Sequence, residues 1–186
     1  MKILKEHSDS AERAAVCMKN GGTIIIPTDT IYGFSSIAGD GGVRIRQIKG
    51  RAETKPFIEL VDSVESAEKI SSIKIPDSLL RYWPGPLTVI VPRKAEFGGG
   101  TVALRCPGDE WLRKVIALTG KSIYSTSVNR SGKPPMLCID EILKEFESEV
   151  DLIVCDGDSK ETAASTLVDI TSGSLKILRQ GAIKLS

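Results

Sequence analysis

Residues 21–33 read GGTIIIPTDTIYG and contain the pattern that decides the fold: a helix stop, a short apolar strand and a polar loop. The two glycines end a helical pattern over residues 11–18, for which Ser8 or Ser10 provides the N-cap. The β-branched run at residues 23–26 predicts a buried strand that the following proline ends. We therefore expect the polar loop to lie at a strand end, where open α/β sheets bind their ligands.

The alternation of helix and strand patterns continues to the C-terminus. Further helices are predicted at residues 43–49, 64–70, 76–82, 111–118 and 140–146, and further strands at 57–61, 87–91, 101–104, 122–127, 152–155, 166–170 and 175–178. Ser63 and Asp109 are the predicted N-caps of two of these helices. The connection between the strands at 87–91 and 101–104 is too short for a parallel crossover. We therefore expect an α/β fold with a twisted mixed sheet flanked by helices, in a single domain over residues 1–186.

Composition excludes several classes of protein. The 186 residues are 41% hydrophobic and 26% charged with a net charge of +1, which argues against disorder and against a general attraction to nucleic acid. No apolar run approaches the roughly 20 residues of a membrane span, and the N-terminal residues resemble no signal peptide, so we expect a cytoplasmic protein without a membrane contact. The four cysteines are widely spaced and His7 is the one histidine, which excludes a zinc cluster, a disulfide framework and a histidine-based triad.

The loop after the first strand has two interpretations. If it stays extended, Thr28, Thr30 and Tyr32 share one face and present two hydroxyls and a phenol to a small polar ligand. Alternatively, the threonines and the aspartate between them satisfy backbone groups in a turn.

Two sets of cations are candidates for binding anions. Lys49, Arg51 and Lys55 lie within seven residues, and this combination of guanidinium and ammonium groups suits a polyphosphate. Their alternative is a solvated basic face. Arg105 follows an apolar strand, where it fits a carboxylate clamp or, alternatively, an ordinary surface ion pair.

The loops near the C-terminal half supply the remaining candidates. Ser127 and Asn129 are two residues apart, so an extended backbone would project a hydroxyl and an amide to the same side. The alternative is a turn rich in serine and asparagine. Ser165 precedes a predicted strand and Arg179 follows another, and neither is a strong signal alone.

Five tracts in order resemble the YrdC-domain family, the threonylcarbamoyl-AMP synthases of tRNA modification: PTDTIYG at 27–33, KGRAETKPF at 49–57, WPGPLT at 83–88, STSVNRSG at 125–132, and STLVDI with ILRQGAI within 165–183. The resemblance covers nearly the whole chain. It implies a basic concave groove and a reaction that joins L-threonine, bicarbonate and ATP into threonylcarbamoyl-AMP and pyrophosphate. It also implies a downstream partner, the tRNA threonylcarbamoyl transferase proteins that make t6A, and a weak contact with tRNA.

The resemblance also implies roles for individual residues. Threonine would contact Thr30, Arg105, Ser127 and Ser165, whereas ATP would contact Arg51, Lys55, Thr101, Asn129 and Arg179. Lys49 and Arg51 would form the catalytic Lys-x-Arg pair. We expect no protein-held metal, with Mg²⁺ arriving as the ATP complex.

The chain departs from the family pattern at two positions. Leu60 stands where many members have a histidine, and Pro135 stands where many have a serine. The resemblance is to the short form without an additional C-terminal domain. Three alternatives to the synthase remain: a YciO-like paralogue without adenylate synthesis, a module whose basic groove binds RNA, and a carbamoyl-transfer role like that of the related domain in hydrogenase maturation factors.

Overall fold

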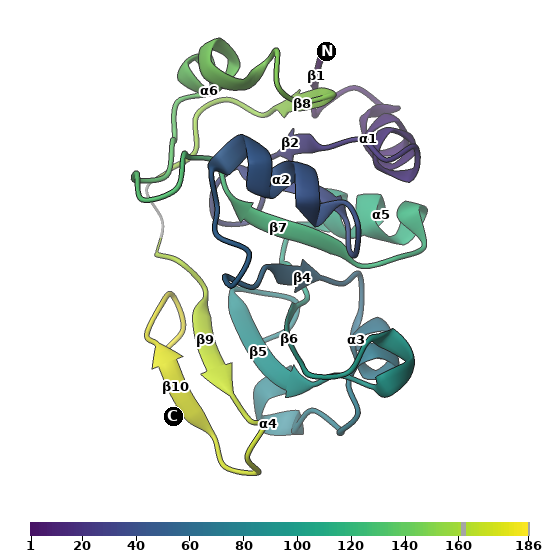
Figure 1. Cartoon of the computed structure of the whole chain (residues 1–186), viewed down its shortest axis with the longest axis vertical. Coiled ribbons are helices and arrows are strands. Elements are labelled where there is room, and N and C mark those ends of the chain that lie inside the picture. The colour runs from purple at the N-terminus through teal and green to yellow at the C-terminus, as the bar shows by residue number, and fades with distance from the viewer. Residues whose placement is uncertain (161–162, 186) are drawn as a thin grey trace.

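A computed structural model describes residues 1–160 and 163–185. Within these ranges, ten strands form one sheet (Figure 1). The strands are β1 (Lys2–Leu4), β2 (Ile24–Ile26), β3 (Gly33–Ile37), β4 (Ile58–Leu60), β5 (Leu87–Pro92), β6 (Thr101–Arg105), β7 (Ile123–Ser127), β8 (Leu152–Cys155), β9 (Thr166–Asp169) and β10 (Lys176–Arg179). The helices are α1 (Ser10–Lys19), α2 (Gly42–Lys49), α3 (Val64–Ile70), α4 (Asp77–Leu80), α5 (Glu110–Thr119) and α6 (Ile139–Phe146), with a 3₁₀ turn at Ala95–Phe97.

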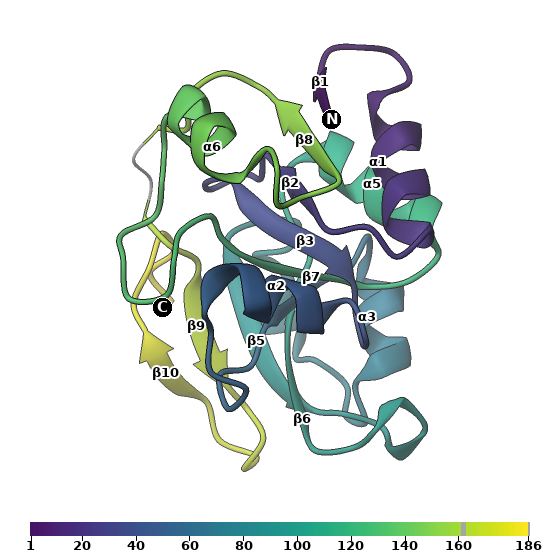
Figure 2. The ribbon, with the colours of Figure 1, turned by 45° about the horizontal axis from the view of Figure 1, so that its top comes forward.

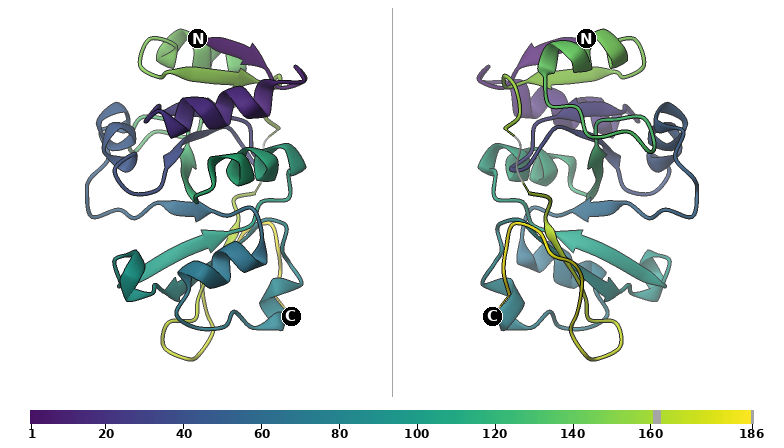
Figure 3. Two further views of the ribbon diagram at one scale, coloured as in Figure 1. Left: turned by 90° about the vertical axis from the view of Figure 1, so that its right-hand side faces the viewer. Right: turned by 90° about the vertical axis from the view of Figure 1, so that its left-hand side faces the viewer.

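The strand order is β1-β8-β2-β3-β7-β4-β6-β5-β9-β10, and the sheet is mixed as predicted. β8 pairs in parallel with β1 and β2, β4 with β6, and β5 with β9, whereas the other neighbours are antiparallel. The pair β5 and β6 is antiparallel, in agreement with its short connection. β1 and the N-terminus lie at one end of the molecule, and β10 and the C-terminus lie at the other (Figure 3).

Alternating side chains divide the core between the two faces of the sheet. Ile24 and Ile26 of β2 pack with α1 and α5, while Ile25, between them, packs with Phe34 and with apolar residues of α2 and α6. α1 and α5 therefore cover one face of this half of the sheet and α2 and α6 the other (Figure 2). A third apolar cluster joins β5, β6 and β9 to α3 and α4.

The helix caps follow the prediction at two sites and differ at a third. The side-chain oxygens of Ser63 and Asp109 accept hydrogen bonds from backbone N–H groups in the first turns of α3 and α5. α1 instead begins at Ser10 with Asp9 as its N-cap residue, and Asp9 makes no side-chain cap bond. Ser10 is itself the first helical residue, and its hydroxyl donates to the carbonyl of Lys5 and accepts from Nε1 of Trp111.

Two strands have no counterpart among the predicted elements. β1 lies in a mixed-charge segment, and it forms because its backbone pairs with β8 while one side chain, Ile3, is buried. β3 reads GFSSI and contains one aromatic residue between small ones. It is a central strand between β2 and β7, and a Cβ at Gly33 would lie 2.7 Å from the Ser125 hydroxyl oxygen, which favours glycine at this position.

Candidate active site

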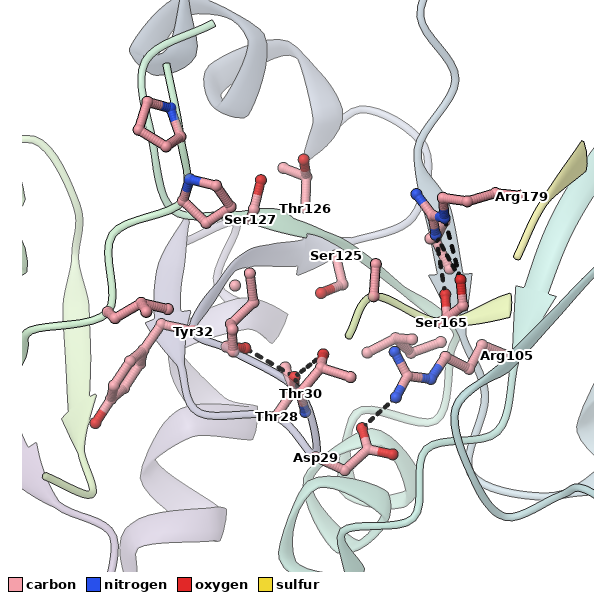
Figure 4. Close-up of a pocket in the computed structure, with 18 of the residues that line it drawn as sticks. Thr28, Asp29, Thr30, Tyr32, Arg105, Ser125, Thr126, Ser127, Ser165 and Arg179 are labelled. Carbon is pink, nitrogen blue, oxygen red and sulfur yellow. Dashed lines mark hydrogen bonds and ion pairs between the residues drawn. The ribbon is translucent and has the colours of Figure 1, made fainter. Parts of the chain in front are cut away.

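One cavity of about 780 Å³ collects most of the predicted site residues (Figure 4). Its walls come from the loop between β2 and β3, the ends of β6 and β7, and the segments that begin β9 and end β10. Six predicted residues line it: Thr30, Arg51, Arg105, Ser127, Ser165 and Arg179. The cavity is basic, since three guanidinium groups face one carboxylate, that of Asp29, among its described lining residues.

The loop before β3 is a turn, so its extended interpretation is wrong. The hydroxyl of Thr28 accepts a hydrogen bond from the backbone N–H of Thr30 at 3.1 Å and donates to the carbonyl of Ile31 at 2.7 Å. The Thr28 and Thr30 hydroxyl oxygens lie 3.0 Å apart. Local satisfaction of backbone groups by threonine bends the chain, and this brings the Thr30 side chain to the cavity.

Tyr32 points from the cavity wall toward the loop after β8 (Figure 4). Its hydroxyl donates to the carbonyl of Gly157 and accepts from the backbone N–H of Asp156, both at 2.7 Å. Burial raises the pKa of this phenol to about 12. Tyr32 therefore joins two loops and stays protonated, and it does not present its hydroxyl to a ligand.

Arg105 is a buried cation, and the protein binds one edge of its guanidinium group through Nε and Nη2. Its Nε donates to the carbonyl of Gly85 at 3.2 Å, and its Nη2 donates to Oδ1 of Asp29 at 2.6 Å. The other oxygen of Asp29 accepts from the backbone N–H of Gly108 at 2.8 Å. The Arg105 residue is 6% exposed, so the surface-pair interpretation is wrong. The remaining donors of this guanidinium face the cavity (Figure 4), and Asp29, whose contact with Arg105 no sequence motif predicts, orients them.

Arg179 and Ser165 form a second fixed group on the same wall. Nε and Nη2 of Arg179 donate to the carbonyl of Ser165 at 3.1 and 2.9 Å. The Ser165 hydroxyl lies 2.8 Å from that of the fully buried Thr88. Partial burial of its guanidinium, and then the charge of Arg105, lower the pKa of Arg179. Both arginines line the same cavity (Figure 4).

Arg51 approaches the cavity from the loop after α2. Its Nη2 donates to the carbonyl of Pro56 at 2.8 Å, and its guanidinium carbon lies 5.1 Å from the centre of the Phe57 ring. Burial, followed by the charge of Arg46, lowers the pKa of Arg51. The Nε of Arg51 is buried and has no hydrogen-bond partner among the described residues. Other atoms of Arg51 line the cavity.

Lys49 and Asn129 lie behind the cavity wall instead of lining it. Nζ of Lys49 donates to the backbone carbonyls of Ser127 and Asn129 and, at 2.8 Å, to Oδ1 of Asn129. The same Oδ1 accepts from the Ser127 hydroxyl at 2.7 Å, so Ser127 and Asn129 do project to the same side. Burial and the charge of Arg51 lower the pKa of Lys49 to about 8. Lys49 and Asn129 therefore hold Ser127 in place through these hydrogen bonds.

Two further predicted nucleotide contacts, besides Asn129, do not line the cavity. Thr101 begins β6 and Arg105 ends it, which separates them by about 13 Å at the rise of a strand. Thr101 is exposed at this far end, and the geometry gives no support to its predicted contact with ATP. Lys55 is exposed beside the lining residue Pro56 and does not itself line the cavity.

Apolar residues complete the lining. Ile58 and Leu60 project from one face of β4, and Pro134, Pro135 and Leu137 close the side after β7. Both departures from the family pattern, Leu60 and Pro135, therefore lie at the cavity. Among residues 1–160 and 163–185, no cluster of three or more histidine, cysteine, aspartate or glutamate side chains could hold a metal ion. No helix in these ranges combines the length and apolar character required to cross a bilayer.

Comparison with known proteins identifies related sequences. Residues 16–181 match the family model Sua5_yciO_yrdC, described as telomere recombination. The threonylcarbamoyl-AMP synthase of Pyrococcus abyssi is 33% identical over 184 residues, which cover 92% of this chain and 54% of that protein. The threonylcarbamoyl-AMP synthase of Bos taurus is 29% identical over 188 residues, or 92% of this chain and 68% of that protein. The chain therefore spans only about half the length of the P. abyssi relative.

Solved structures have the same fold. The crystal structure of P. abyssi Sua5 complexed with L-threonine superposes with a TM-score of 0.83 at 30% identity, covering 92% of this chain and 54% of that one. Escherichia coli YciO superposes with a TM-score of 0.86 at 20% identity, covering 99% of this chain and 95% of that one. The mixed sheet flanked by helices is the fold of both structures.

Proposed function

We propose that this chain, which belongs to the Sua5, YciO and YrdC family, forms threonylcarbamoyl-AMP and pyrophosphate from L-threonine, bicarbonate and ATP. The observation that carries the proposal is the convergence of three guanidinium groups with the hydroxyl groups of Thr30, Ser127 and Ser165 in one cavity of about 780 Å³. A cavity of this size holds a ligand as large as a nucleotide. The structure of P. abyssi Sua5 complexed with L-threonine supports the choice of amino acid.

The chemistry forms an N–C bond and a P–O bond. Bicarbonate first takes up a proton and loses water, which gives CO₂. The amine of threonine then attacks CO₂ and releases a proton, which gives a carbamate. An oxygen of this carbamate then attacks the α-phosphorus of ATP, and pyrophosphate leaves. Neither step requires a histidine. Nearby cations favour the neutral amine, which is the nucleophile, and fixed orientation of the reactants contributes much of the acceleration.

The contacts around the cavity suggest how the residues divide this work. Arg105, whose free edge faces the cavity, would bind the carboxylate of threonine, and Thr30 and Ser127 would bind its other polar groups. Arg51 and Arg179 would neutralise the charge that develops on the phosphates. Lys49 would act through Ser127, because its ammonium contacts the chain behind the wall.

We assign no side chain to Mg²⁺, which would enter as the ATP complex. Both carboxylate oxygens of Asp29 are already engaged, by Arg105 and by the backbone of Gly108. The product is a mixed anhydride of a carbamate and a phosphate. We propose that tRNA threonylcarbamoyl transferase proteins in the cytoplasm consume it to make t6A.

The test is incubation with ATP, Mg²⁺, bicarbonate and each amino acid in turn, with pyrophosphate and the new adenylate measured by chromatography. We expect release that depends on bicarbonate and is highest with threonine. Arg51→Ala should abolish release while circular dichroism shows an intact fold. Release that does not depend on an amino acid, or near-normal release by Arg51→Ala, would contradict the proposal.

A further inference from the structure

The loop at residues 50–56 brings Arg51 to the cavity but has little packing of its own. It leaves α2 at Gly50, whose φ of +61° lies in the left-handed region that favours glycine. Residues 52–56 are all exposed. One backbone bond, from the N–H of Lys55 to the carbonyl of Ala52 at 3.2 Å, closes a turn within it. The position of Arg51 must therefore depend on contacts between this loop and its surroundings.

Arg46 supplies such contacts from the last turn of α2. Its Nη1 donates to the carbonyl of Ala52 and to the carbonyl of Lys55, both at 2.9 Å. A guanidinium Nη carries two N–H groups, so one nitrogen holds both ends of the turn. In addition, the backbone carbonyl of Arg46 accepts from the N–H of Arg51 at 2.9 Å. A single residue thus fixes the loop at three points.

The ring of Phe57 connects Arg46 to Arg51. The guanidinium carbon of Arg46 lies 4.5 Å from the centre of this ring, and that of Arg51 lies 5.1 Å from it. Phe57 is itself fixed, because it is 6% exposed and packs against Tyr124 with ring centres 4.9 Å apart. Stacking on a fixed ring restricts both guanidinium planes.

From these contacts we propose that Arg46 is a positioning residue, which orders the loop at residues 50–56 and so presents Arg51 to the phosphates of the nucleotide. Arg46 does not line the cavity and acts through its neighbour. Its charge also lowers the pKa of Arg51, which is an electrostatic cost of holding two guanidinium groups close together. The inference rests on the proposed function in one respect, the identity of the nucleotide as ATP.

Arg44 offers a matched control because it has the same charge and lies on the same helix. Its guanidinium binds Asp151 at 2.8 Å and the carbonyl of Glu149 at 3.0 Å, away from the loop. Residues two positions apart on a helix point in different directions. Comparing Arg44→Ala with Arg46→Ala therefore separates the loss of a positive charge from the loss of the loop contacts.

The experiment measures loop order and nucleotide affinity in the full chain. Hydrogen exchange of the peptide that covers residues 50–56 should become faster in Arg46→Ala and stay unchanged in Arg44→Ala. In calorimetry, Arg46→Ala should weaken ATP binding about tenfold, the effect of losing roughly one charge-assisted hydrogen bond, and change threonine binding less than twofold. Arg46→Lys, which keeps the charge and can reach a carbonyl, should give intermediate values for both exchange and ATP affinity.

The outcomes separate this inference from the proposed function. Wild-type ATP affinity in Arg46→Ala would overturn the inference, whether or not the loop exchanges faster, and would leave the synthase proposal standing. An equal loss in Arg44→Ala and Arg46→Ala would also overturn it, because charge alone would then explain the effect. If the wild-type protein binds ATP and makes no adenylate, the synthase proposal fails, and the affinities of the variants still decide the role of Arg46.

Discussion

Replacing Lys49 with methionine tests whether this lysine is a buried support. In the folded protein the residue is 2% exposed, and its ammonium is surrounded by carbonyl oxygens of Ser127 and Asn129. Burial and the nearby charge of Arg51 lower its pKa from 10.5 to about 8. Methionine fills a similar volume and has no proton to lose, so Lys49→Met removes this titration and largely preserves the packing.

The pKa shift of Lys49 determines the sign and the size of the difference in unfolding free energy between the wild type and Lys49→Met. A shift from 10.5 to about 8 corresponds to about 3 kcal/mol. Between these two pH values the unfolded chain keeps the lysine proton and the folded chain has lost it, so the free energy of unfolding rises with pH. This gain in the free energy of unfolding is fully present above pH 10.5. It is lost as the pH falls from 10.5 through about 8. The wild type should therefore gain about 3 kcal/mol relative to Lys49→Met over this window.

Urea unfolding followed by the fluorescence of the two tryptophans measures this difference directly. Tyr32 and Cys106, whose pKa values are raised to about 12 and about 11 by burial, titrate in both proteins and cancel in the comparison. Parallel stability curves for the wild type and Lys49→Met would refute the reasoning, since they would mean that the ammonium is solvated. That result would favour a lysine that reaches the cavity and acts on phosphate directly.

Three further substitutions test the site and the fold. Arg105→Ala should raise the threonine requirement in the pyrophosphate assay by about 10- to 100-fold, the range expected for a lost charge-assisted contact, and affect the ATP requirement less; equal effects would contradict the carboxylate clamp. Gly181→Ala should destabilise the fold measurably in urea, because its Cβ would lie 2.1 Å from the carbonyl oxygen of Ala164; an unchanged midpoint would show that this backbone contact can relax. Ser63→Ala should cost about 1 kcal/mol of unfolding free energy by removing the bond to the N–H of Ser66, whereas no loss would mean that water replaces the cap.

Local pattern predicts the elements of this fold that carry their own signal. The capped helices α3 and α5 have the expected bounds within about one residue, because an N-cap and an apolar periodicity act over a few residues. β1 and β3 lack such a signal and form through pairing with the distant strands β8 and β7, respectively. Tertiary context therefore decides these two strands, and a single sequence contains little information about it.

The same distinction holds in the candidate site. The charge of Arg105 and its place at a strand end could be predicted from the sequence, but its burial could not, because Asp29 meets it from 76 positions away in the chain. Lys49 and Arg51 are separated by one residue, and the sequence suggests one shared role. In the structure they diverge, since the helix C-terminus at Gly50 turns Arg51 toward the cavity and leaves Lys49 directed into the core.

The different positions of Lys49 and Arg51 suggest that the cations of this site have different roles. A cation that binds an anionic ligand directly must keep unsatisfied donors at the cavity, and Arg51, Arg105 and Arg179 each combine contacts to the protein with a position on the cavity wall. A cation whose three donors are all occupied by carbonyl oxygens, as in Lys49, has none left for a ligand. Burying its charge costs free energy, which the three hydrogen bonds offset in part, and the same bonds hold Ser127 in place. Replacing Lys49 should consequently weaken threonine binding, through the displacement of Ser127, more than it weakens binding of the ATP phosphates.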